Sequence, residues 1–98
     1  MAYSFLSRFR VKSECDAEFV ALIAEMEANA TAEQDTLAYK FYRLDGDGMF
    51  GVYESFTDER GDKAHQANPA NGPIIEKMIA CMAGGYEREL LYDVTPAA

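Results

Sequence analysis

The chain has few residues of the kinds that usually hold metals, form disulfides or bind polyanions. Its 98 residues include no tryptophan, one histidine, two cysteines and three prolines, with 9 lysines and arginines against 17 aspartates and glutamates. The formal net charge of -8 and the lack of a basic cluster argue against nucleic acid or an anionic membrane surface as a partner. One histidine, scattered carboxylates and no glycine-rich phosphate loop favour neither a metal nor a cofactor.

The amino-terminal residues also lack a long hydrophobic run. Residues 1–16 carry Arg8, Arg10 and Lys12 among their apolar side chains, so they match neither a signal peptide nor a membrane-spanning helix. We therefore expect a cytoplasmic protein. Cys15 and Cys81 have no CxxC or metal-ligand spacing, and a reducing compartment predicts two free, partly buried thiols. The sequence does not decide whether a disulfide joins them.

Length and composition predict a single domain over residues 1–98. With 49% hydrophobic and 27% charged residues, the chain has the composition of an ordinary globular protein. It is long enough for one hydrophobic core, and short enough that association with a second copy would add stability.

The hydrophobic pattern predicts alternating strands and helices. Alternation with period two or a high content of strand-forming residues predicts strands at residues 3–11, 36–44, 49–56 and 85–94. Helical spacing predicts a helix over residues 14–29 with Ser13 as its cap, and another that begins at Pro73 and is ended by Gly84 and Gly85. A short helix over residues 59–66 follows Asp58. Residues 45–48 predict a hairpin turn, and residues 95–98 a frayed tail.

This order, β-α-β-β-α-β with one extra short helix, predicts an α+β, ferredoxin-like antiparallel sheet with its helices on one face. The other face of the sheet would then expose an apolar set: Leu6, Met49, Tyr53 and a share of Tyr39, Phe41, Tyr42 and Leu44. That much exposed apolar surface predicts a homodimer through the open face of the sheet.

Two polar residues stand out as site candidates. Glu54 shares the inward face of its strand with apolar neighbours, where an ionised carboxylate is costly unless it is paired, hydrogen-bonded or protonated. Glu54 could instead reach water at the strand end. His65 is the sole histidine and is either structural or functional. Ser7 is a small polar residue in the otherwise aromatic inward row of the first strand. The space beside it would serve either close packing with a neighbour or the binding of a ligand.

The segment around these candidates resembles a known family. Tyr53-Glu54-Ser55-Phe56 with Ala64-His65 is similar to the signature of the antibiotic biosynthesis monooxygenase (ABM) superfamily, and the resemblance covers nearly the whole chain. It implies a dimeric α/β barrel with a cavity between helices and sheet in each subunit. The family includes cofactor-free oxygenases, haem-degrading enzymes and an isomerase-like branch. The haem-degrading pattern is missing. That pattern requires an asparagine where this chain has Ser7, a tryptophan where it has His65, and a histidine near Ile75.

The resemblance implies a cofactor-independent monooxygenase that acts on a small phenolic or quinol substrate with O2. His65 would be the base, Glu54 would orient His65 or tune its pKa, and Ser7 or Tyr39 would bind a substrate oxygen. The pocket would be shaped by Phe5, Phe9, Phe50, Val52 and Phe56. Two alternatives stay open: a non-catalytic dimer that binds a small aromatic molecule or serves as an accessory domain, and an isomerase or lyase that uses the same His/Glu pair without O2.

Overall fold

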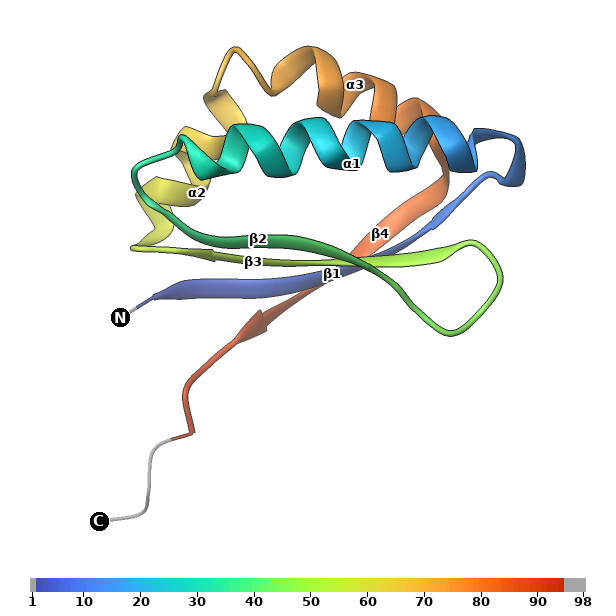
Figure 1. Cartoon of the computed structure of the whole chain (residues 1–98). Coiled ribbons are helices and arrows are strands. Elements are labelled where there is room, and N and C mark those ends of the chain that lie inside the picture. The colour runs from blue at the N-terminus through green and yellow to red at the C-terminus, as the bar shows by residue number, and fades with distance from the viewer. Residues whose placement is uncertain (1, 95–98) are drawn as a thin grey trace.

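A computed structural model describes residues 2–94 and contains a four-stranded antiparallel sheet with helices on one face (Figure 1). The strands are β1 (Tyr3–Val11), β2 (Thr36–Arg43), β3 (Met49–Phe56) and β4 (Met82–Leu91), in the sheet order β2-β3-β1-β4. The helices are α1 (Asp16–Thr31), α2 (Glu59–Ala67) and α3 (Gly72–Cys81). This confirms the predicted α+β, ferredoxin-like fold. The predicted tail, residues 95–98, lies outside the described residues.

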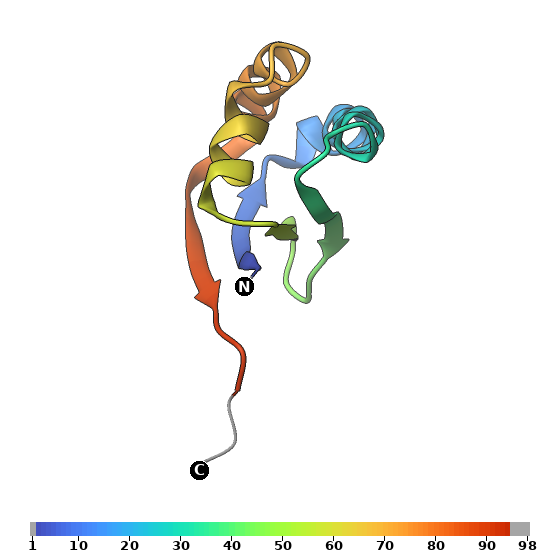
Figure 2. The ribbon, with the colours of Figure 1, turned by 90° about the vertical axis from the view of Figure 1, so that its left-hand side faces the viewer.

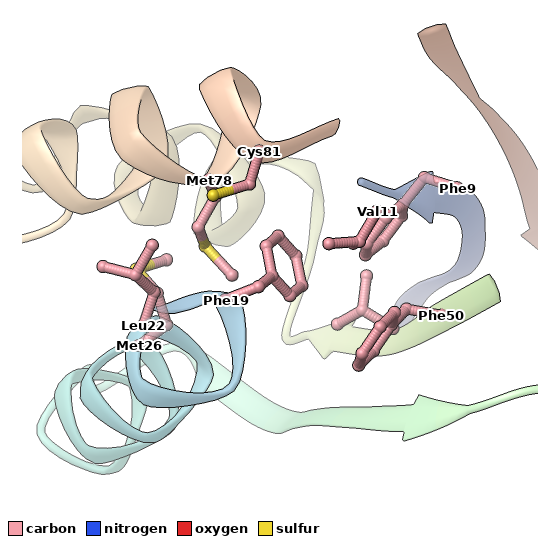
Figure 3. Packing of buried hydrophobic residues seen from close by; sticks show 9 residues of the cluster. Phe9, Val11, Phe19, Leu22, Met26, Phe50, Met78 and Cys81 are labelled. Carbon is pink, nitrogen blue, oxygen red and sulfur yellow. The ribbon is translucent and has the colours of Figure 1, made fainter. Parts of the chain in front are cut away.

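The helices and the inward face of the sheet enclose the hydrophobic core. Figure 2 shows α1 and α3 next to each other on the same side of the sheet. The register pairs Phe9 of β1 with Phe50 of β3, and Phe19 of α1 packs onto both rings (Figure 3). Because strand side chains alternate, Phe5, Ser7 and Phe9 all point toward the helices. The inward row therefore supplies both core and site.

The start of α1 differs from the prediction. A short 3-10 turn, η1 (Ser13–Cys15), precedes the helix, which begins at Asp16 with Cys15 as its N-cap residue. The Ser13 hydroxyl donates to the neighbouring carboxylate of Glu14 instead of capping the helix. Ser13 lies too early in the chain to reach the free amide groups of the first helical turn.

The junction of α3 and β4 also differs. Gly84 and Gly85 do not end the helix; α3 ends at Cys81 and β4 begins at once at Met82, ending at Leu91 rather than Val94. The pairing of β4 with β1 shifts register between Phe9 and Val11, and Gly84 within the shifted stretch has φ of 92°. A glycine adopts this left-handed conformation without a steric penalty, so the glycines accommodate an irregularity in the strand.

Gly61 in α2 illustrates how closely this short helix approaches its neighbours. A Cβ at this position would lie 3.0 Å from Phe56 Cβ and 3.1 Å from the Asp35 backbone oxygen. We expect Gly61→Ala to lower the free energy of unfolding by about 1 kcal/mol or more, because the clash outweighs the gain in helix propensity.

Gly72 in α3 provides the matched control, since a Cβ there has no atom within 4 Å. Urea denaturation of both variants checks the prediction. We expect Gly72→Ala to be neutral or stabilising, and equal stability of the two variants would contradict the account.

Candidate functional site

A cavity of about 420 Å³ lies between the sheet and the helices α2 and α3. Its wall combines aromatic and aliphatic side chains with a few polar groups. The lining residues are Phe5, Ser7, Phe9, Tyr39, Phe41, Val52, Glu54, Asp62, His65, Gln66, Ile75, Met78, Ile79, Met82, Tyr86 and Arg88. A concave, mainly apolar space with a small number of polar groups is typical of a small-molecule site.

The structure brings most of the sequence-predicted site residues to this cavity. The ones that line it are His65, Glu54, Ser7, Tyr39, Phe5, Phe9 and Val52. They come from β1, β2, β3 and α2, and the antiparallel register of the strands aligns them; Phe5, for example, lies opposite Glu54. The cavity is therefore assembled by long-range pairing.

Phe50 and Phe56 do not line the cavity, contrary to the prediction from the alternating pattern. The Phe50 ring packs in the core, with its centroid 5.2 Å from that of Phe19. The fully buried Phe56 ring packs behind the imidazole of His65 at a centroid distance of 5.5 Å. Both residues share the inward face of β3 with Glu54, but they are at its two ends and support the wall from outside.

His65 projects from α2 and is only 5% exposed. Its Nδ1 lies 2.7 Å from Glu33 Oε1, so the tautomer with a proton on Nδ1 donates to that carboxylate. The other ring nitrogen, Nε2, is then a free acceptor when the imidazole is neutral. Nε2 lies 3.8 Å from Glu54 Oε1, beyond hydrogen-bond distance. An imidazole nitrogen that is able to accept a proton is thus held in a fixed orientation at the cavity wall.

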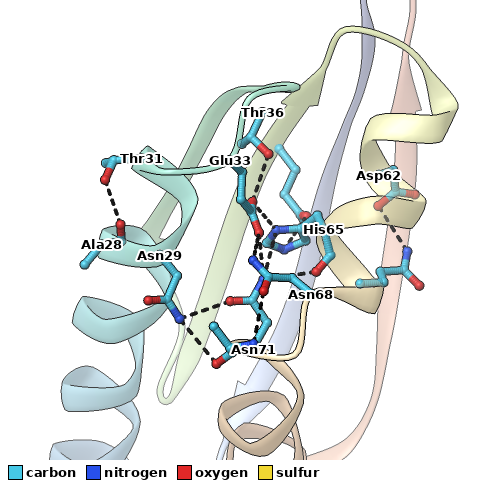
Figure 4. A network of polar contacts seen from close by, with 12 residues as sticks. Ala28, Asn29, Thr31, Glu33, Thr36, Asp62, His65, Asn68 and Asn71 are labelled. Carbon is cyan, nitrogen blue, oxygen red and sulfur yellow. Dashed lines mark hydrogen bonds and ion pairs between the residues drawn. The ribbon is translucent and has the colours of Figure 1, made fainter.

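Glu33 is the residue that orients His65, and the sequence reading missed it. Besides His65, its carboxylate accepts hydrogen bonds from Thr36 Oγ1 (2.9 Å), Asn68 Nδ2 (2.9 Å) and Asn71 Nδ2 (2.9 Å), as Figure 4 shows. The orienting role that the sequence suggested for Glu54 therefore belongs to Glu33. Glu33 lies in the short link before β2, where no periodic pattern distinguishes it from its polar neighbours.

Glu33 is held in its charged form. Burial by itself raises the pKa of this carboxyl, but the hydrogen bonds from Asn68, His65 and Thr36 outweigh burial and bring the pKa below its ordinary value. An ionised carboxylate on Nδ1 stabilises the imidazolium that forms whenever Nε2 takes up a proton.

Glu54 has the opposite character. Burial and the negative charge of Asp62 raise its pKa from 4.5 to about 8, against the opposing effect of Arg88. Near neutral pH this carboxyl therefore holds a proton that it can donate. The two carboxyls flanking His65 differ in protonation, which is a common arrangement in acid–base sites.

The pKa of Glu54 predicts how stability depends on pH. The folded protein holds this proton up to about pH 8, whereas the unfolded chain releases it near its ordinary pKa of 4.5. Stability from this group is therefore complete below pH 4.5 and is lost as the pH rises through 8, by up to about 1.4 kcal/mol per pH unit. We expect Glu54→Gln to lack this decline.

Urea denaturation of wild type and Glu54→Gln at pH 5, 6, 7 and 8 measures this difference directly. Other titrating groups contribute equally to both proteins, so the difference in free energy of unfolding isolates Glu54. Parallel curves across this range would contradict the assignment.

Arg88 of β4 forms the cationic part of the wall and was also missed. Its guanidinium carbon lies 3.7 Å from the ring centroid of Phe5, and its Nη2 lies 3.0 Å from Oδ2 of the buried Asp62. Alternation in β4 would have placed Arg88 on the inward face, but a charged residue in an edge strand usually faces solvent. Its partner Asp62 lies in α2, and no local sequence pattern predicts the pairing of these two residues.

Tyr39 of β2 completes the polar part of the wall. Its ring centroid lies 4.7 Å from that of His65. Burial raises the pKa of the Tyr39 phenol above its ordinary value, and the charge that Glu54 carries above its own pKa adds to the shift. The Tyr39 hydroxyl therefore keeps its proton. Tyr39 can thus donate a hydrogen bond to a ligand, but it does not act as a base near neutral pH.

Comparison with known proteins places this chain in a family. The sequence profile of the family described as "Antibiotic biosynthesis monooxygenase" matches residues 3–76. The chain belongs to this antibiotic biosynthesis monooxygenase family. No curated protein sequence matches the chain significantly. Among residues 2–94, no helix is both long and apolar enough to cross a membrane.

Solved structures share the fold at low sequence identity. An antibiotic biosynthesis monooxygenase aligns with a TM-score of 0.88 at 20% identity, over 97% of this chain and 100% of that one. Rv0793 from Mycobacterium tuberculosis aligns with a TM-score of 0.86 at 15% identity, over the whole of both chains. A mutant of SnoaB, a cofactor-independent oxygenase from Streptomyces nogalater, has a TM-score of 0.80 at 21% identity, over 97% of this chain and 95% of SnoaB.

Proposed function

We propose that this protein is a cofactor-independent monooxygenase that acts on a small phenolic or quinol substrate with O2. The observation that carries the proposal is the orientation of His65, whose Nδ1 is bound by Glu33 and whose Nε2 is left to the cavity. Membership of the family supports it, as does the description of SnoaB as a cofactor-independent oxygenase.

In the proposed reaction the substrate supplies the electrons. His65 Nε2 accepts the phenolic proton, and the electron-rich anion passes one electron to O2. Recombination of the two radicals forms a carbon–oxygen bond. The carbon then loses its hydrogen as a proton while the O–O bond breaks, so that one oxygen stays in the product as a carbonyl. The other oxygen takes up this proton and the one from the phenol and leaves as water. Two hydrogens and one O2 are consumed for each carbonyl and each water formed.

Each group of the site has a role in this scheme. Glu33 stabilises the imidazolium of His65 after proton uptake, and the neutral carboxyl of Glu54 donates a proton to the departing oxygen. Ser7 or Tyr39 binds a substrate oxygen. The apolar walls of Phe5, Phe9 and Val52 hold the aromatic ring and keep water from the reactive anion.

Oxygen consumption tests the proposal. Purified wild type, freed of metals with a chelator, is assayed with a panel of hydroquinones and polycyclic phenols against a heat-denatured control. Uptake of O2 above the control supports the proposal. Turnover of a substrate without O2 would instead establish proton-transfer chemistry by the same pair, as in an isomerase or lyase, and thermal stabilisation by a ligand that is recovered unchanged would establish a binding protein.

The proposal includes a cytoplasmic location, which the free thiols of Cys15 and Cys81 support. It also includes a homodimer formed through the open face of the sheet. Leu6 and Tyr53 lie opposite each other at the centre of that face. Tyr39 and Phe41 do not contribute to it, because both line the cavity on the other side.

We expect the double variant Leu6→Lys with Tyr53→Lys to be monomeric, because a dimer would bury both added charges. Light scattering after size-exclusion chromatography measures the mass. Val20→Lys is the control, since Val20 is 43% exposed on α1, away from the open face. A monomeric wild type, or a double variant that stays dimeric, would contradict this interface.

A further inference from the structure

Three side chains with metal-binding atoms meet outside the lining of the cavity. The sulfurs of Cys15 and Cys81 and a carboxylate oxygen of Glu18 all lie within 4.8 Å of one another. No sequence pattern predicts this cluster, because 66 positions separate the cysteines and no ligand spacing links them. None of the three residues lines the cavity.

The backbone fixes this cluster from two sides. Cys15 directly precedes α1 and Glu18 follows one helical turn later, so both face the same direction. Cys81 is the last residue of α3, and its carbonyl accepts a hydrogen bond of 2.9 Å from the Lys12 amide. The Lys12 carbonyl in turn accepts one of 3.0 Å from the Cys15 amide. The three residues are thus positioned by the folded chain itself.

We propose that Cys15, Glu18 and Cys81 form a binding site for one zinc ion, with water as the fourth ligand. Zinc takes thiolate and carboxylate ligands in tetrahedral geometry, with Zn–S bonds of about 2.3 Å and Zn–O bonds of about 2.0 Å. Such a site needs its ligand atoms about 3.5 to 3.8 Å apart. Cys81 Sγ lies 3.1 Å from Glu18 Oε2, and no two of the three ligand atoms are more than 4.8 Å apart. Shifts of about 1 Å or less therefore bring the three atoms to these separations.

The donor set selects the kind of metal. Two thiolates favour zinc and other soft or borderline ions over calcium or magnesium, which prefer oxygen ligands alone. Cys81 is 1% exposed and lies in the core (Figure 3). Glu18 is exposed to solvent, so an ion can enter the site from its side. The bound ion joins the start of α1 to the end of α3.

Titration calorimetry with ZnCl2, on the full chain kept reduced with a phosphine, tests the site. Binding of one Zn²⁺ per chain is expected. Co²⁺ in place of Zn²⁺ is expected to give a thiolate-to-metal absorption band in the near ultraviolet. Cys15→Ser and Glu18→Gln are expected to weaken Zn²⁺ binding by about tenfold or more, because even residues that only support metal ligands contribute that much.

Glu14→Gln is the control, since it removes one neighbouring charge but no ligand, and its affinity for Zn²⁺ is expected to match wild type. Circular dichroism verifies that each variant is folded. Three results would overturn the proposal: no saturable binding by the reduced wild type, binding that Cys15→Ser leaves unchanged, or a Co²⁺ complex without a thiolate band. These readouts do not depend on oxygenase activity, so this site and the proposed function fail separately.

Discussion

Replacing His65 by glutamine is expected to lower kcat for O2 uptake by about 10² to 10⁴-fold, the usual contribution of a positioned general base. In wild type, His65 Nδ1 donates a hydrogen bond of 2.7 Å to Glu33. The glutamine amide can still donate a hydrogen bond to Glu33. The variant therefore removes the proton acceptor while keeping the buried carboxylate partnered. Steady-state O2 consumption with a substrate that wild type accepts measures the effect.

Lys63→Gln is the matched control for this variant, because Lys63 lies on the exposed side of the same helix. We expect it to retain wild-type kcat. Far-ultraviolet circular dichroism and the thermal midpoint verify that His65→Gln is folded. A folded His65→Gln variant with wild-type kcat would remove the base from the mechanism.

Glu33→Ala is expected to cause the largest loss of stability, about 3 kcal/mol in the free energy of unfolding. The carboxylate is 11% exposed and accepts hydrogen bonds from four residues. Without it, the buried amide of Asn71 and the Nδ1 proton of His65 lose an acceptor. Asn71 is fully buried, so its amide depends on acceptors within the protein.

Urea denaturation measures this loss, with Glu25→Ala as the control. Glu25 is an exposed glutamate on α1, so its removal should change the free energy of unfolding by less than about 0.5 kcal/mol. Equal stability of the two variants would show that the network around Glu33 contributes little. Activity of Glu33→Ala should also fall, because nothing then fixes the tautomer of His65.

The fold was predictable because its signals are periodic and local. Alternation along β1 and β3 correctly assigned the inward faces, and the resulting order of strands and helices leaves few topologies. Errors occurred where local conformation overrides the pattern. The glycine pair after α3 predicts a helix end, whereas Gly84 accommodates a register shift inside β4.

The candidate site was predictable only in part. Glu54 stood out because a carboxylate among apolar residues violates the strand pattern, and His65 because it is the single histidine. Glu33 and Arg88 gave no such signal, since each is an ordinary polar residue in a link or an edge strand. Their importance comes from partners distant in sequence, His65 for Glu33 and Asp62 for Arg88, which only the tertiary structure reveals.

The fate of the oxygen atoms tests the central claim most directly. An accepted phenolic substrate is converted by wild type under ¹⁸O2 in ordinary water, and the product is analysed at once by mass spectrometry. The account predicts one labelled oxygen atom in each product molecule, with the other in water. Product that carries no label, or that forms equally well without O2, would contradict it.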